Sequence, residues 1–147
     1  MNAQNLTQKS LEAIQTAQSM ALENRNNYIT PEHLLYALVD QDGGLIPSLL
    51  GKMGVDCNAV LAELDTAISA LPKVGSTSDA YLSPETNRIL TAAEKAAKSM
   101  GDEYLSVEHL TSLFLTFSKL LDISYKPYYQ TQKHQLYKKI ASYISFV

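Results

Sequence analysis

The chain has 147 residues, 46% of them hydrophobic, and a formal net charge of −3, enough for one domain or two small halves that share a core. It has no run of about 18 apolar residues and no signal peptide at its start, so we expect a soluble, cytoplasmic protein without membrane contact. Its single cysteine, Cys57, excludes an internal disulfide and fits a reducing compartment.

In chain order, the first predicted helix covers about residues 7–23, and Thr7 is its natural N-cap. Apolar side chains recur at three- and four-residue spacing along it, which gives the helix one buried face: Leu11, Ile14, Ala17 and Ala21. Glycines and polar residues separate the next predicted helices: residues 31–39, residues 45–53 and a helix that Asp56 caps.

A stretch rich in Pro, Gly and Ser follows and is predicted to be a linker over residues 72–80. After it, Ser83 caps a fifth helix that Gly101 ends, and Val107 opens a sixth. No stretch alternates with the period of two that a strand would show. The predicted class is therefore all-α.

The second half of the chain repeats the first. The stretch Tyr28-Ile-Thr-Pro-Glu-His-Leu-Leu35 returns 76 positions later as Tyr104-Leu-Ser-Val-Glu-His-Leu-Thr111. The same register aligns Ala17 with Ala93 and Ala21 with Ala97. Such self-similarity indicates a duplicated unit. We predict two pseudo-repeated four-helix units, about eight helices in all, on a shared core: repeat one over 5–71 and repeat two over 81–147, with 119–147 divergent.

The repeated motif is typical of a loop that feeds a helix. Thr30 and Ser106 are favoured N-cap residues, and each is followed by a glutamate in the first turn, where the helix dipole favours negative charge. Glu-His occurring twice could suggest a metal or acid–base site. However, a helical His-Glu-x-x-His type of site needs a second histidine, and positions 37 and 113 are Ala and Leu. We therefore interpret both histidines as braces of helix starts and expect no metal.

Residues 119–147 differ in character from the rest. They hold five lysines and one acid (Asp122), which gives +4, whereas residues 1–118 carry −7. Five of the nine tyrosines also lie there. Lysines among tyrosines could form a nucleic-acid surface, but a solvated helix face is the preferred interpretation, and altered sequence is a third. Residues 130–144 keep the apolar spacing of the fourth helix and are interpreted as its counterpart.

Several motifs together resemble the N-terminal domain of Clp/Hsp100 AAA+ chaperones. Besides the repeated motif, they are Asp42-Gly-Gly-Leu-Ile-Pro47, Leu71-Pro-Lys-Val74 and Tyr81-Leu-Ser-Pro-Glu-Thr-Asn-Arg-Ile-Leu90. Within that family the pattern is most similar to the ClpB disaggregase branch. The resemblance covers residues 5–110 and fades beyond them.

The resemblance implies a client-binding domain without enzyme activity of its own. In the family, ATP and magnesium act in the AAA+ rings that follow this domain, and no Gly-x4-Gly-Lys-Ser/Thr phosphate loop occurs in these 147 residues. The implied partners are unfolded or aggregated polypeptides, adaptor proteins and the rings of the same chain, and not nucleic acid. The isolated domain is expected to be a monomer and its parent a hexamer.

The resemblance also implies an apolar groove for client segments. Its positions in this sequence would be Thr7, Leu90, Asp102, Glu108 and His109. Each residue also has a plainer interpretation: Thr7 as a helix cap, Leu90 as core, and the two acids as helix-end charges. The alternative function is an adaptor-docking or regulatory subunit of a Clp protease.

Overall fold

The computed structural model describes residues 3–110 except Met53 and Thr77. Within this part the protein is mostly helical, which confirms the all-α prediction. The predicted helices beyond residue 110 and the divergent stretch 119–147 lie outside the described residues, and the repeat boundaries stay a prediction. The helices are η1 (Ala3–Asn5, a 3-10 turn), α1 (Gln8–Glu23), α2 (Pro31–Val39), α3 (Leu45–Lys52), α4 (Cys57–Ser69) and α5 (Pro84–Met100).

The helix starts follow from their cap residues. The Thr7 hydroxyl accepts a hydrogen bond from the Ser10 amide at 3.3 Å, and the Ser83 hydroxyl accepts one from the Thr86 amide at 3.1 Å. Such bonds satisfy first-turn amides that have no partner inside the helix. Gly101 ends α5 with φ of 77°, a left-handed conformation that a side chain would disfavour. Residues 107–110 are helical, as predicted for the start of the sixth helix.

The structure contains two short strands that the sequence did not predict. β1 (Tyr28–Ile29) pairs in parallel with β2 (Tyr81–Leu82). Two residues are too few to show a period of two, and the pairing joins segments from different halves of the chain. The expectation of no strand was therefore wrong in this detail, although the fold class stands.

A second parallel pairing mirrors the first. Leu6 forms a bridge with Leu105, and Ile29 pairs with Leu82. Shifting each residue by 76 positions converts one pair into the other. In both pairs, the segment before the first helix of one repeat lies against the segment before the second helix of the other repeat. The two halves are thus interlocked through their backbones.

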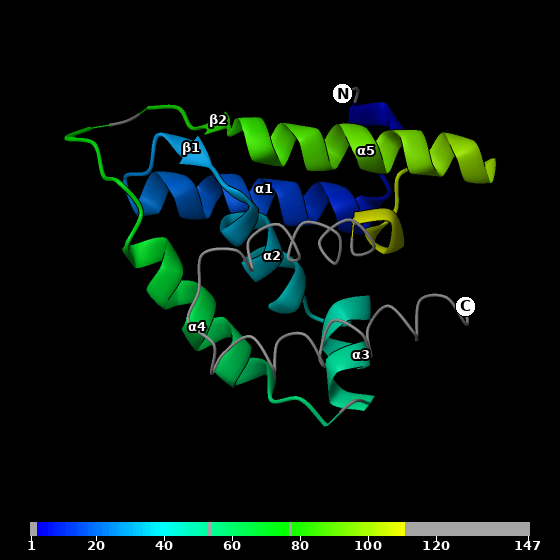
Figure 1. The fold of residues 1–147 in the computed structure, drawn as a ribbon, viewed down its shortest axis with the longest axis horizontal. Coiled ribbons are helices and arrows are strands. Elements are labelled where there is room, and N and C mark those ends of the chain that lie inside the picture. Colours follow the sequence, from blue (N-terminus) through cyan, green and yellow to red (C-terminus); the bar gives the residue numbers. More distant parts are fainter. Residues whose placement is uncertain (1–2, 53, 77, 111–147) are drawn as a thin grey trace, which may run out of the picture.

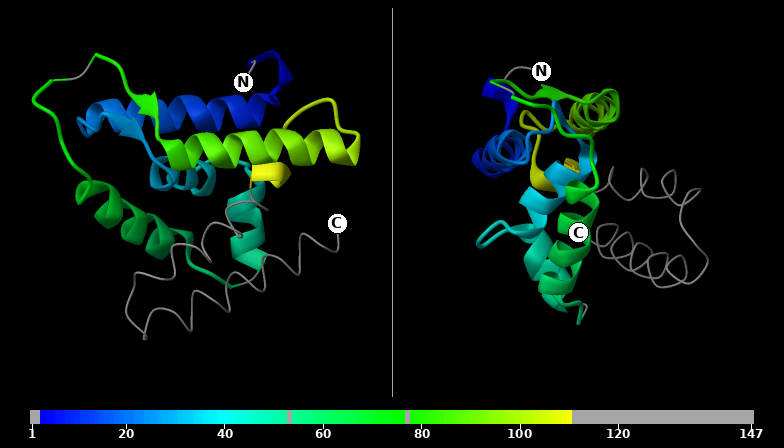
Figure 2. Two further views of the ribbon diagram at one scale, coloured as in Figure 1. Left: turned by 45° about the horizontal axis from the view of Figure 1, so that its top comes forward. Right: turned by 90° about the vertical axis from the view of Figure 1, so that its left-hand side faces the viewer.

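The helices form three levels (Figure 1). α1 and α5 run in opposite directions along one side of the molecule, α2 lies beneath them, and α3 and α4 lie farthest from α5. The end-on view in Figure 2 shows the same order. α2 packs against both α1 and α4 and brings Leu34 and Leu38 into the core, each 1% exposed. None of the helices in the described ranges is long and apolar enough to cross a membrane.

The α1 face that meets the core consists of small residues. Ala17 and Ala21 are fully buried, and Ala13 is 1% exposed. Their counterparts in α5, Ala93 and Ala97, are 0% and 3% exposed. Small side chains let neighbouring elements approach closely, so these positions set how near the two long helices come to the rest of the core.

The linker between the repeats is tied to the loop that follows α1. The Val74 amide donates to the Arg25 carbonyl at 2.9 Å, and the Asn26 side-chain amide donates to the Pro72 carbonyl at 3.1 Å. Arg25 has φ of 58°, so this loop bends sharply. The first residues of the linker therefore have fixed partners in repeat one.

Close packing around Ala17 makes a test of the fold. Replacing Ala17 with Leu should lower the unfolding midpoint, because extra methylenes at a fully buried position cost about 1–3 kcal/mol through overpacking. Gln18→Leu, at an exposed position one residue away, is the matched control and should leave the midpoint nearly unchanged. Thermal unfolding followed by circular dichroism measures both, and equal midpoints would contradict the proposed packing.

Candidate functional site

The two repeated histidines make equivalent hydrogen bonds. In His33, Nδ1 accepts from the Thr30 amide at 3.0 Å, and in His109 it accepts from the Ser106 amide at 3.0 Å. The other ring nitrogen, Nε2, bonds Asn26 Oδ1 at 3.1 Å in repeat one. In repeat two, Nε2 bonds the Asp102 carboxylate at 2.9 Å. Each histidine therefore braces a helix start, as predicted from the sequence, and also holds the loop seven residues before it, which was not predicted.

These bonds fix the tautomer of His33. Because the Thr30 amide can only donate, Nδ1 must be the unprotonated nitrogen, and Nε2–H donates to Asn26. The side chain is fully buried. Burial lowers the pKa of His33, and the nearby Glu32 carboxylate opposes this effect without overcoming it.

The described residues offer no metal-binding chemistry around these rings. No group of three or more His, Cys, Asp or Glu side chains in residues 3–110 is placed to hold a metal ion. Both nitrogens of each ring are already engaged by the loop and the helix start.

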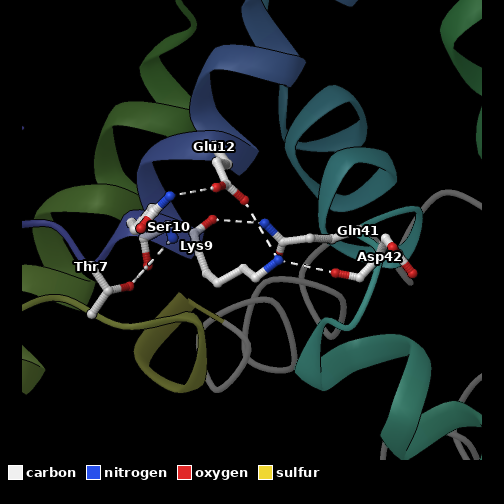
Figure 3. Close-up of polar contacts among 7 residues, drawn as sticks. Thr7, Lys9, Ser10, Glu12, Gln41 and Asp42 are labelled. Carbon is white, nitrogen blue, oxygen red and sulfur yellow. Dashed lines mark hydrogen bonds and ion pairs between the residues drawn. The ribbon is translucent and has the colours of Figure 1, made fainter.

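Thr7 occupies the point where repeat one meets repeat two. Its backbone amide donates to the Leu105 carbonyl at 3.1 Å, while its hydroxyl caps α1. The same turn of α1 is held from the other side, as Figure 3 shows. There Lys9 Nζ donates to the Asp42 carbonyl at 3.0 Å, and the Gln41 side-chain amide donates to the Lys9 carbonyl at 2.9 Å. The start of α1 is thus fixed on both sides.

The five residues that the resemblance implies for a groove do not all reach the surface. Asp102 is half-exposed and Glu108 is exposed, whereas His109 is only 6% exposed. Leu90 is 2% exposed and belongs to the hydrophobic core, so the structure does not place it in an open groove. The reason is its spacing with Ile89 and Ala93, which puts it on the buried face of α5.

A small depression opens beside Thr7, where the start of the chain meets α5 and the loop after it. Its lining includes Asn5, Leu6, Glu94, Lys98, Asp102 and Leu105. Of the five predicted residues, only Asp102 lines it. Thr7 adjoins it through its bond to Leu105, and His109 through its bond to Asp102. Two strongly exposed apolar side chains, Met100 at 70% and Tyr104 at 53%, lie at the ends of the same loop.

Sequence reasoning missed most of this lining. Residues 5 and 6 meet residues 94–105 only because the two repeats interlock, and no local pattern reveals that contact. One missed residue, which belongs to the histidine brace of repeat one and not to this lining, could have been found. Asn26 stands 76 positions before Asp102, so the repeat register points to it as the partner of His33.

Most of the chain matches a known domain family. Residues 5–116 match the family described as the Clp repeat (R) N-terminal domain. The chain belongs to this Clp N-terminal domain family. Chaperone protein ClpB of Porphyromonas gingivalis is 42% identical over 116 residues, which are 79% of this chain and 13% of that protein. ClpB of Mesorhizobium japonicum is 38% identical over 111 residues, 75% of this chain and again 13% of the relative. This Clp-N chain therefore spans about an eighth of the length of those relatives.

Solved structures share the Clp-N fold. The Hsp104 N-terminal domain of Candida albicans superimposes with a TM-score of 0.72 at 18% identity, covering 81% of this chain and 79% of that one. The N-terminal domain of the Escherichia coli ClpV1 ATPase also gives 0.72, at 25% identity, covering 80% and 71% of the two chains. These matches confirm the predicted Clp/Hsp100 domain type.

The burial of Leu90 makes a sharp prediction. Leu90→Glu should lower the unfolding midpoint strongly or prevent folding, because an unpaired carboxylate in the core costs several kcal/mol. Asn87→Glu changes an exposed position of the same helix and should leave stability within about 0.5 kcal/mol. Chemical denaturation of both variants checks this. A Leu90→Glu variant as stable as the parent would instead show that position 90 faces solvent.

Proposed function

We propose that this domain binds segments of unfolded or aggregated polypeptides for a ClpB-type disaggregase. The observation that carries the proposal is the depression lined in part by Asp102 and Glu103, with the exposed side chain of Tyr104 next to them in sequence and that of Met100 at the end of α5. Exposed apolar side chains next to a concave, partly charged surface are typical of protein-interaction sites. Among the structural relatives, a ClpV N-domain is known in complex with a VipB peptide.

The chemistry of the surface favours weak and permissive binding. The depression is small, so it can bury only a few side chains of an extended segment. A disordered client must also be ordered on binding, which offsets much of the contact energy. We therefore expect modest affinity with limited sequence preference, which suits a domain that must release its clients onward.

The motor activity is proposed to lie elsewhere in the protein. The ClpB relatives are about eight times longer than the matched region, as their 13% coverage implies. In our proposal, AAA+ rings in the parent protein bind ATP and magnesium and assemble as a cytoplasmic hexamer. This domain, as a monomeric module, supplies client contact.

Docking of a folded adaptor is the alternative function. It is favoured by the similarity of the fold to the N-terminal domain of ClpD from Arabidopsis thaliana, a caseinolytic protease associated chaperone, with a TM-score of 0.59. A folded adaptor would cover a broader surface than a single extended segment does.

A matched pair of tyrosines tests the client-binding proposal. Tyr104→Ser should weaken binding of a fluorescently labelled unfolded polypeptide roughly fivefold to tenfold, because it removes an exposed aromatic that lies in sequence between two residues lining the depression, Glu103 and Leu105. Tyr28→Ser removes the equivalent tyrosine of repeat one, 49% exposed, away from the depression. It should leave affinity unchanged. Fluorescence anisotropy measures both, and melting curves confirm that both variants are folded.

Equal weakening by the two substitutions, or none by either, would contradict the assignment of the site. Loss of binding to a folded adaptor with unchanged binding of the unfolded polypeptide would favour the alternative function.

A further inference from the structure

The cluster around His33 connects the start of α2, the loop after α1 and the linker between the repeats. The ring accepts the Thr30 amide at the start of α2 and donates to Asn26 in the loop after α1. Asn26, 2% exposed, passes the connection on by donating from its side-chain amide to the Pro72 carbonyl at 3.1 Å. A single ring thus joins a helix start, a loop and the linker between the repeats.

We propose that His33, Asn26 and the Pro72 carbonyl form an acid-sensitive latch that holds the inter-repeat linker at neutral pH and releases it when the ring is protonated. The proposal goes beyond the client-binding function, because it concerns how the two repeats are held together. It rests on the direction of each hydrogen bond in the cluster.

Protonation of His33 removes the acceptor on which the hydrogen bond from the Thr30 amide depends. The added proton goes to Nδ1, the nitrogen that accepts the Thr30 amide. Two N–H groups would then face each other. The new N–H can turn to the Thr30 hydroxyl, 3.0 Å away, but the amide of Thr30 is left without its acceptor. A partly buried amide that loses its acceptor is destabilising, so the ring must move or the cluster must open.

The surroundings of the ring offer the new positive charge little support. At Nε2 stands the neutral amide of Asn26. The charged residues nearest in sequence are Glu32 on α2, Asp40 at the C-terminal end of that helix and Arg25 in the preceding loop. Among the residues that the structure describes, only Glu32 acts on the ring by its charge, and burial outweighs it.

The direction of the pH effect follows from these facts. In the unfolded chain His33 takes up a proton near its ordinary value of about 6.5, while burial lowers its pKa in the folded protein. The unfolded or opened state therefore binds the proton first as the pH falls. The stability that the neutral ring contributes is complete above the ordinary value and is lost as the pH falls below it, toward the lower folded pKa.

The second repeat holds a built-in comparison. His109 makes the same bond to its helix start, but its Nε2 meets the carboxylate of Asp102 at 2.9 Å. A carboxylate can compensate a charged imidazole, whereas an amide cannot. We therefore expect the acid-sensitive opening at the His33 cluster and not at the equivalent place in repeat two.

Hydrogen–deuterium exchange on the complete 147-residue chain tests the latch. Protection of the Thr30 and Val74 amides, corrected for intrinsic rates, should fall about tenfold between about pH 7 and about pH 5. The Thr7 amide donates to the Leu105 carbonyl where the start of α1 pairs with repeat two, away from the His33 cluster, and it should keep its protection. Unchanged protection of Val74 across this range would overturn the proposal.

Two substitutions separate the ring from other acid effects. In His33→Gln the side chain can still accept the Thr30 amide and donate to Asn26, as in an ordinary capping box, but it does not titrate. Its Val74 protection should not depend on pH. Asn26→Asp has no N–H to donate to the Pro72 carbonyl, so it should lower Val74 protection already at about pH 7. If His33→Gln loses protection with acid as the parent does, the latch is not His33; this holds whether or not Asn26→Asp folds.

Discussion

The backbone pairing between the two repeats is the constraint on which the rest of the structure depends. Ile29 pairs with Leu82, and Leu6 pairs with Leu105. Pairs this short would not be stable alone. They persist because each paired segment ends at a helix cap: Thr7 and Ser83 follow one member of each pair, and Thr30 and Ser106 the other. The pairing therefore decides where four helices begin and which of their first turns meet.

Duplication produced two equivalent surfaces that have diverged in charge. The second repeat carries Glu94, Lys98, Asp102 and Glu103 around the depression, and the same register in the first repeat holds Gln18, Leu22, Asn26 and Asn27. All four charged positions are thus neutral in repeat one. The backbone symmetry is kept while the side chains differ, so the charges around the depression of repeat two have no counterpart in repeat one.

The helices could be predicted from the sequence because local signals determine them. Apolar spacing and cap residues such as Ser83 and Gly101 act within a few positions of the boundaries they set. The short strands could not be predicted, because their pairing joins residues about 50 and 100 positions apart and depends on the interlocked halves. The burial of Leu90 lies between these cases. Its spacing along the helix indicated a buried position in the core, whereas the family resemblance implied a position in an open groove.

A histidine at the third helical position is an unusual choice for a helix start, where glutamate or glutamine commonly completes a capping box. Glutamate can accept the cap amide but cannot also donate to a loop residue. The imidazole does both, because its two nitrogens lie on opposite sides of a rigid ring. Because both nitrogens can bond at once, the ring of His33 also bonds Asn26 and the ring of His109 also bonds Asp102, and in both cases the partner lies seven residues earlier. The same property makes the brace of repeat one depend on protonation, because there the second ring nitrogen meets a neutral amide, whereas in repeat two it meets a carboxylate.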